Sequence, residues 1–342
     1  MRQQITAFIV VTMAATAPQL GCAFDTGDDS ETVSSELTAS SPADRAALAL
    51  RWAPVHYQDV DPTGSHALGG ASDFITRVDF DGDLDGRNNW DNAGNAAFAK
   101  SAHAYFSVVE TSTHWFIVYM FFHPRDWVDF FIGSEHENDA EGVLVAVARD
   151  GSTYGAPRAA VTVAHSDFFS YLFPGATWTS GQESVDGTLQ ISTFDGGSHP
   201  VTAQQAKGHG LKARPQYDIT GGDGVVYFPS LATAEVPASA NDRDVLYKLV
   251  DIFEPGGLWD NRALPSLFAA FGSFAGDRTG GCGQGTLGGC TTNSAAPPWG
   301  WDDTNDASVR GRLATDPAGL VTSYFTVTEP ADTAYTFNPY QL

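Results

Sequence analysis

Short stretches rich in apolar and β-branched residues recur along this chain, and they predict a fold built mainly from β-strands. Sequences rich in Gly and Asp, such as 195–197 and 221–224, separate these stretches and contain residues that tolerate the positive φ of tight turns. The predicted strands lie at 115–122, 142–148, 159–163, 188–192, 224–228 and 320–327.

One segment instead has apolar residues at helical spacing. Residues 242–253 follow Asn241, a suitable N-cap, and their apolar side chains fall on one stripe. The stripe contains Val245, Leu246, Leu249, Val250 and Phe253. We therefore predict a helix at 242–253 that packs on the sheet as an insertion.

Composition supports a β-rich class. The chain has 342 residues, of which 42% are hydrophobic and 17% charged, with 22 Phe, 11 Tyr, 8 Trp and 35 Gly. Many aromatic residues and glycines suit strands joined by tight turns, so we predict an all-β fold, a β-sandwich with helical and loop insertions. No second polar linker interrupts 43–342, which predicts a single domain. The formal net charge of -23 would repel phosphates, which argues against nucleic-acid binding.

The N-terminus has the pattern of an export signal over 1–21. Arg2 precedes an apolar stretch that is too short to span a bilayer. The polar segment 22–42 cannot bury enough apolar surface to fold, so we predict a disordered tether there. The protein is thus expected to be exported, either as a lipoprotein of the bacterial outer envelope or as an extracellular protein.

The three cysteines fit this interpretation. Residues 19–22 resemble a bacterial lipobox, which predicts a lipid on Cys22 as the membrane anchor in place of a transmembrane helix. Alternatively, Cys22 belongs to a peptide that is removed. Cys282 and Cys290 lie in one Gly-rich loop and are predicted to form a small disulfide in an oxidising compartment.

The strongest candidate site lies between the apolar runs 115–122 and 142–148. If these runs pair as antiparallel strands, Asp126 and Asp139 meet at one end of the pair. Strand alternation places Asp139 and Glu141 on the face that carries the valines of the second run, which should point into the core. Buried carboxylates are costly unless a cation or hydrogen-bond donors neutralise them.

A bound metal would meet this need. We predict a divalent-metal site formed by Asp126, His136, Asp139 and Glu141. Oxygen and imidazole ligands without a thiolate favour Mg²⁺, Ca²⁺ or Mn²⁺ over a structural Zn²⁺. The alternative is a hydrogen-bonded polar patch in which Arg125 bridges the carboxylates.

The same segment resembles the core of the necrosis- and ethylene-inducing peptide-like proteins. Residues 124–126 and 136–142 match that family's Pro-Lys-Asp-like turn and its His-x-x-Asp-x-Glu spacing. The resemblance implies a β-sandwich in which Asp126, His136, Asp139 and Glu141 surround a divalent cation that helps to bind a sphingolipid sugar headgroup before membranes are damaged. Two positions depart from the pattern, because Asn138 replaces a second His and Ala140 replaces a Trp.

A second resemblance is to the vacuolar protein sorting-associated protein 62 family. It covers short pieces between Trp52 and His209, namely 53–55, 136–141 and 199–201 leading to 208–209. That family's activity is poorly defined, so this resemblance implies a fold and a site more than a function.

Two further signals stand apart from the main cluster. Asp81, Asp83 and Asp85 alternate before Gly86 as in the opening of a Ca²⁺ loop, although a solvated acidic turn is the alternative. His165 and His209 each follow a strand-like run and could approach the metal as a ligand or a general base. Gly208 and Gly210 would allow backbone or ligand to approach His209 closely.

Three functional hypotheses follow. In the first, a tethered or secreted protein uses its metal cluster to bind a glycan or lipid headgroup on a membrane, with membrane damage as an accompanying activity and with Trp127, Phe130 and Phe131 lining the rim. In the second, the protein is a metal-dependent hydrolase of phosphate or glycosidic esters with Glu141 or His209 as base. In the third, it is a structural surface lipoprotein whose metal only stiffens the fold.

Overall fold

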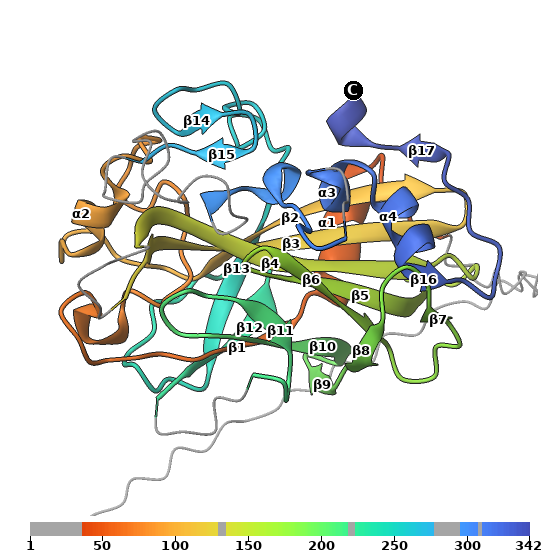
Figure 1. Cartoon of the computed structure of the whole chain (residues 1–342), viewed down its shortest axis with the longest axis horizontal. Helices are drawn as coiled ribbons and strands as arrows, with labels where there is room; N and C mark the ends of the chain where they lie inside the picture. The colour runs from red at the N-terminus through yellow and green to blue at the C-terminus, as the bar shows by residue number, and fades with distance from the viewer. Residues whose placement is uncertain (1–35, 129–134, 218–222, 277–294, 307–309) are drawn as a thin grey trace, which may run out of the picture. The chain divides into compact units, whose positions relative to one another are not determined.

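The computed structural model describes residues 36–128, 135–217, 223–276, 295–306 and 310–342. Among these residues, thirteen strands form one sheet in the order β11-β10-β1-β12-β13-β2-β3-β4-β5-β6-β8, while β17 pairs with β2 and β9 pairs with β10 (Figure 1). Its strands are β1 (Val55–Gln58), β2 (His103–Thr111), β3 (His114–Asp126), β4 (His136–Ala148), β5 (Ala156–Ala164), β6 (Asp167–Leu172), β8 (Val185–Thr188), β9 (Ile191–Phe194), β10 (Gly197–Gln204), β11 (Leu211–Ala213), β12 (Val225–Ser230), β13 (Val245–Asp251) and β17 (Tyr335–Phe337).

Short elements complete the fold around this sheet. The remaining strands pair two by two: β7 (Thr179–Ser180) with β16 (Phe325–Thr326), and β14 (Phe268–Ala270) with β15 (Ser273–Phe274). The α-helices are α1 (Pro42–Trp52), α2 (Asn89–Ala93), α3 (Arg312–Thr315) and α4 (Pro317–Tyr324), and 3₁₀ turns lie at η1 (Leu68–Gly70), η3 (Pro298–Gly300) and η4 (Pro339–Gln341). Among the described residues, no helix is long and apolar enough to cross a bilayer.

The sheet curls round on itself. β11 stands at one end of the strand order, yet it contacts β4 and β5 in the middle of the sheet. The predicted β-rich class is therefore confirmed. The finer prediction of a β-sandwich is not, because one curled sheet, like half a barrel, takes the place of two separate sheets.

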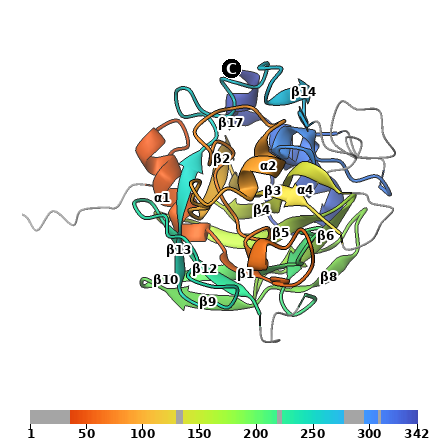
Figure 2. The same ribbon diagram turned by 90° about the vertical axis from the view of Figure 1, so that its left-hand side faces the viewer.

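β3 and β4 are buried on both faces, which explains their nearly continuous apolar sequences. Trp115, Ile117 and Tyr119 pack into the core inside the curl, whereas Phe116 and Val118 pack into a second core on the other face. α1 contributes to the first core and α4 to the second, and Figure 2 shows these helices on opposite sides of β3 and β4. Removing this apolar area from water is the main stabilising contribution to the centre of the sheet.

The predicted helix at 242–253 is wrong. Its central residues form β13, which runs parallel to both of its neighbours, β12 and β2. Val245, Tyr247 and Leu249 alternate into the core inside the curl, so the strand period was present beside the helical one. Hydrogen bonds to two flanking strands, which the local sequence does not reveal, favour the extended form.

The other strand predictions have mixed outcomes. The segments 115–122, 142–148, 159–163 and 224–228 fall on β3, β4, β5 and β12. Segment 188–192 instead contains the end of β8 and the start of β9, and most of 320–327 is the helix α4. Pro317 occupies the first turn of α4, where it is well tolerated, and Leu320, Val321 and Tyr324 reach the core at helical spacing.

Several N-terminal and loop predictions lie outside the described residues. These are the export signal 1–21, Cys22, most of the tether 22–42, and the disulfide between Cys282 and Cys290. The last residues of the tether segment are described: Glu36 pairs with Arg149 at 2.7 Å, and the buried backbone N–H of Ala39 donates to Glu110 at 2.7 Å.

Candidate functional site

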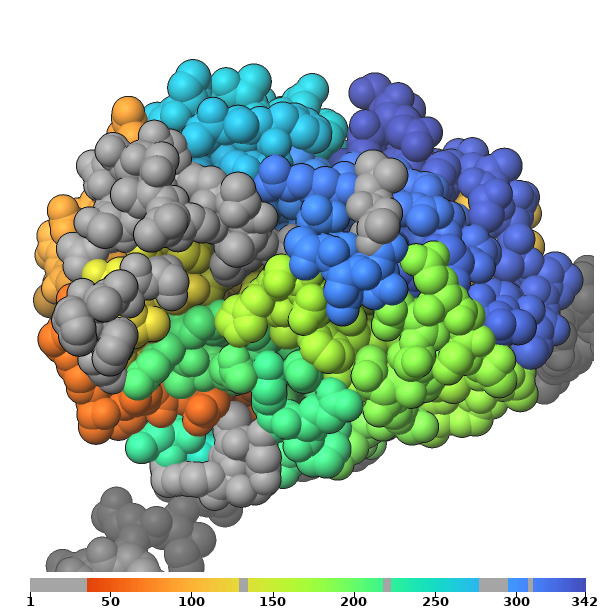
Figure 3. All heavy atoms as spheres, viewed as in Figure 1, coloured from red at the N-terminus to blue at the C-terminus, as the bar shows by residue number. Residues whose placement is uncertain are grey.

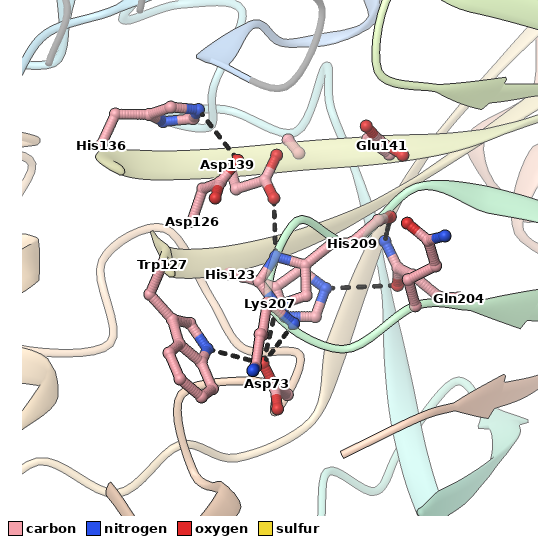
Figure 4. A network of polar contacts seen from close by, with 12 residues as sticks. Asp73, His123, Asp126, Trp127, His136, Asp139, Glu141, Gln204, Lys207 and His209 are labelled. Carbon is pink, nitrogen blue, oxygen red and sulfur yellow. Dashed lines mark hydrogen bonds and ion pairs between the residues drawn. The ribbon is translucent and has the colours of Figure 1, made fainter. Parts of the chain in front are cut away.

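The predicted cluster lies at one end of β3 and β4, inside the curl of the sheet. The two strands pair antiparallel, with His123 opposite Asp139 and Asp126 opposite His136. Asp139 and Glu141 lie on the core side together with the valines of β4, as strand alternation predicted. The connection between β10 and β11 closes the site from the other side (Figure 4).

Asn138 interrupts the alternation of β4. Its φ is +61°, and its amide donates hydrogen bonds to the carbonyl oxygens of Gly86 and Ala275, each at 2.6 Å. In an uninterrupted strand, His136 and Asp139 would point to opposite faces because they are three residues apart. The left-handed turn at Asn138 instead lets His136 lie near both Asp126 and Asp139.

Asp126 and His136 form a buried pair. His136 Nε2 lies 3.3 Å from Asp126 Oδ2, and His136 Nδ1 donates to the carbonyl oxygen of Glu137 at 3.0 Å. Burial alone would lower the pKa of His136, but the charge and hydrogen bond of Asp126 outweigh it and raise that pKa to about 9. Without a bound cation, this imidazole therefore carries a positive charge at neutral pH, and it would have to lose its Nε2 proton to serve as a metal ligand.

His209 is held between two carboxylates. Its Nδ1 lies 2.6 Å from Asp139 Oδ2 and its Nε2 lies 3.2 Å from Asp73 Oδ1, and all three side chains are fully buried. Burial opposes the charge, but the two carboxylates outweigh it and raise the pKa of His209 to about 10. Both ring nitrogens then donate hydrogen bonds, so neither has a free lone pair that could accept a proton.

Asp73 was not identified from the sequence. Besides His209, its Oδ1 accepts the indole N–H of Trp127 at 2.8 Å and the backbone N–H of Lys207 at 2.9 Å, and its Oδ2 accepts the backbone N–H of Asp61 at 2.8 Å. Trp127 was expected on an exposed rim, but its side chain is fully buried and serves as this donor. Phe130 and Phe131, the other predicted rim residues, lie outside the described residues.

A neutral histidine stacks on the charged one. The rings of His123 and His209 are 3.7 Å apart at an interplanar angle of 3°. Burial and the charge of His209 keep the pKa of His123 well below its usual range. Gln204 Oε1 accepts from Nε2 of His123 at 3.2 Å and of His56 at 3.0 Å, and its amide donates to the His209 carbonyl at 2.6 Å.

His165 contacts the cluster from outside. Its backbone N–H donates to Glu141 Oε1 at 2.6 Å, while its side chain is 47% exposed and therefore within reach of a ligand. The ring lies against Gly208 and Gly210, where an added Cβ would come within 3.0 Å of it. These glycines thus make room for His165, which is a different role from the predicted opening beside His209.

Two carboxylate oxygens of the cluster have no protein donor. Among the described residues, Asp139 Oδ1 and Glu141 Oε2 are buried without a hydrogen-bond partner. Burial raises the pKa of both side chains, and that of Glu141 lies well above its usual range. The free oxygens and the nearby Asp126 and His136 are chemically suited to a divalent cation. In the part of the chain that the structure describes, however, no three His, Cys, Asp or Glu side chains already stand at metal-binding distances.

The separate acidic loop satisfies its carboxylates locally. Asp85 forms an ion pair with Arg87 at 2.7 Å, Asp81 accepts from the Asn92 amide at 2.7 Å, and Asp83 accepts from the Asn88 amide at 3.2 Å. The Ca²⁺ loop of Asp81, Asp83 and Asp85 stays a prediction.

The main cluster lies close to the surface. In Figure 3, atoms from the start of β4, in yellow, reach the surface beside the green atoms of the connection between β10 and β11.

Comparison with known proteins gives only distant structural matches. No family model and no curated protein matches the chain, so the resemblance to the vacuolar protein sorting-associated protein 62 family gains no support. Among solved structures, Necrosis and Ethylene inducing Protein 2 from the causal agent of cocoa's witches' broom disease is 18% identical, covering 67% of this chain and 81% of its own, with a TM-score of 0.29. NLPPya in complex with mannosamine is 14% identical, covering 65% and 79%, with a TM-score of 0.28. A protein described as a toxin fold for microbial attack and plant defense is 17% identical, covering 52% and 71%, with a TM-score of 0.28.

Proposed function

We propose that Asp126, His136, Asp139 and Glu141 bind one divalent cation, Mg²⁺, Ca²⁺ or Mn²⁺, and that this site binds a polar ligand such as a glycan or a lipid headgroup. The observation that carries the proposal is the pair of buried carboxylate oxygens, Asp139 Oδ1 and Glu141 Oε2, which lack a donor among the described residues. Such groups are costly to bury, and a cation would remove the cost. When bound, the cation would supply a positive centre for hydroxyl or phosphate oxygens.

The arrangement of donors supports this role. Each buried carboxylate has one oxygen fixed by the protein, Asp139 Oδ2 by His209 and Glu141 Oε1 by the backbone N–H of His165. Donors of this kind orient metal ligands and leave the second oxygen available. Because these donors hold Asp139 and Glu141 in place, the movement needed to bind a cation would fall on Asp126 and His136, at the end of β3 and the start of β4.

The hydrolase alternative fits the geometry less well. A general base needs a free lone pair, but both ring nitrogens of His209 donate to carboxylates. Burial raises the pKa of Glu141 well above its usual range, which disfavours the ionised form that a base requires. Ligand binding is therefore the function that we propose, at the cell exterior and with a lipid anchor on Cys22, and with membrane damage as its consequence.

Cation binding can be tested directly on the purified full chain. After EDTA treatment and buffer exchange, calorimetric titration with Ca²⁺, Mg²⁺ and Mn²⁺ should show one site, and Asp139→Asn should weaken binding by at least about tenfold. Asp195→Asn, in an exposed turn with φ of +46°, is the matched control and should bind like the wild type. Circular dichroism would verify that both variants are folded.

The outcomes separate the hypotheses. Absence of any divalent-cation binding, or equal binding by Asp139→Asn, refutes the proposed site. Binding of glycolipid vesicles that EDTA abolishes supports the ligand-binding function. If the cation raises the thermal stability but vesicle and glycan binding are the same with and without it, the site is structural and the proposed function is wrong.

A further inference from the structure

Two hollows flank the C-terminal half of α1, far along the sheet from the cation cluster. The cluster lies where β4 begins, whereas the hollows lie near Tyr154, just beyond the end of β4 at Ala148. The first hollow has a volume of about 340 Å³ and the second about 360 Å³. Both are lined by Arg51, which therefore stands between them.

The lining of both hollows is mainly apolar and partly open to solvent. Tyr154 and Leu231 line the first hollow and Ile191 lines the second. These side chains are 37%, 40% and 39% exposed, so three of the most exposed large apolar residues in the described chain gather at this place. Gathered apolar exposure of this kind is typical of a binding surface, whereas single exposed residues are not informative.

Arg51 supplies a positive charge at the junction. Its guanidinium stacks on the Trp52 ring at 4.4 Å and donates to the Ser198 carbonyl at 2.8 Å. Among the described residues, no carboxylate forms an ion pair with Arg51. Of the residues that the structure describes, Asp195 is the one carboxylate that lines the first hollow, and none lines the second. In a chain with a formal net charge of -23, this placement favours an anionic ligand.

We propose that the first hollow binds a single long-chain carboxylate, with its carboxylate at Arg51 and its hydrocarbon chain along the apolar lining of that hollow. The planar guanidinium matches a carboxylate in a two-bond arrangement, and its stacking on Trp52 fixes its orientation. Leu50 and Phe194 offer further contacts for the chain in this hollow. This site is independent of the cation cluster.

Titration of the full chain with decanoate, below its micelle concentration and with EDTA present, tests the proposal. Decanoate should bind one site in the wild type, and Arg51→Gln should weaken it by about tenfold because a charged hydrogen bond is lost. The matched control Arg243→Gln changes an exposed arginine that lines neither hollow and should bind decanoate like the wild type. Octanoate, which is two methylenes shorter, should bind up to about fifteenfold more weakly than decanoate, since each buried methylene contributes about fourfold.

A neutral ligand separates the role of charge from that of packing. Decan-1-ol should bind the wild type and Arg51→Gln equally, which would also show that the hollows remain intact in the variant. Absence of decanoate binding, or equal decanoate affinity in wild type and Arg51→Gln, overturns the proposal. Binding of zwitterionic vesicles without binding of monomeric decanoate would assign the surface to a bilayer and also overturn it. Asp139→Asn should leave decanoate binding unchanged, so failure of the cation site is distinguishable from failure here.

Discussion

Replacing His209 by Asn should destabilise the metal-free protein strongly and in a pH-dependent way. The variant removes the buried positive charge between Asp139 and Asp73 but keeps a residue that tolerates the φ of +49° at this position. Asp73 keeps three N–H donors, from Trp127, Lys207 and Asp61. Asp139 loses the imidazolium that pairs with it, and the Asn amide can offer only a neutral hydrogen bond in its place, so most of the cost falls on this carboxylate.

The size of the destabilisation depends on whether the Asp139 carboxyl group stays ionised or takes up a proton. Leaving one buried charge unpaired costs about 3–5 kcal/mol. The carboxyl group can instead take up a proton, which at pH 7 costs about 4 kcal/mol, because the unfolded pKa is about 3.9 and each pH unit above it adds about 1.4 kcal/mol. At pH 5 the same protonation costs only about 1.5 kcal/mol. The destabilisation should therefore fall from about 4 to about 1.5 kcal/mol between pH 7 and pH 5.

Urea denaturation of wild type and His209→Asn in EDTA at both pH values measures these quantities. In the Asp139→Asn background the same substitution should cost only about 1 kcal/mol, since no buried carboxylate is then left unpaired. The wild type should also lose stability as the pH rises from about 6.5 towards 10, because the raised pKa of His209 makes its charge stabilising below that range. A cost below about 1 kcal/mol at pH 7, or an equal cost at pH 5 and pH 7, would refute the assignment of His209 as the internal cation.

Two further predictions concern single substitutions away from His209. Gly142→Ala should destabilise the protein by about 3 kcal/mol in urea titrations, because an added Cβ would overlap the backbone oxygen of Tyr119, whereas Gly187→Ala, with open space around it, should stay within about 0.5 kcal/mol. Burial raises the pKa of Asp303, which accepts a hydrogen bond from Tyr324, to about 6, so the wild type should lose stability as the pH rises from about 4 to 6. Asp303→Asn should remove that pH dependence, and an unchanged stability profile in this variant would contradict the raised pKa.

The local sequence was sufficient to predict those elements whose structure depends on contacts between segments that are close in sequence. β3 and β4 are neighbours in sequence and in space, so their apolar runs and the alternation of Asp139 and Glu141 could be interpreted without the rest of the fold. β13 could not, because its sequence has both helical and strand periodicity and its strand form depends on two parallel neighbours, of which β2 is distant in sequence. The pairing of β13 with β2, for example, joins residues about 145 positions apart, as Lys248 with His103.

The candidate site shows the same division. The four predicted residues gather at one end of β3 and β4, and His209 was a candidate because glycines flank it. Asp73, however, lies in the connection between β1 and β2, on a segment without any local motif, and the packing of this segment against the connection between β10 and β11 brings it within 3.2 Å of His209. A sequence could suggest such a residue only as an isolated carboxylate among 41 acidic side chains.

The carboxylates of the cluster can be neutralised by imidazolium ions, by protons or by a cation, and at Asp139 the imidazolium ion and the proposed cation use different oxygen atoms. His209 bonds to Oδ2 of Asp139, while Oδ1 of the same carboxylate has no partner among the described residues. A cation on Oδ1 would stabilise the ionised carboxylate even after His209 is removed. If the proposed site binds Ca²⁺, saturating Ca²⁺ should therefore reduce the destabilisation caused by His209→Asn at pH 7. Should that destabilisation stay the same in EDTA and in saturating Ca²⁺, Asp139 is not a ligand, and the internal histidines alone neutralise the cluster.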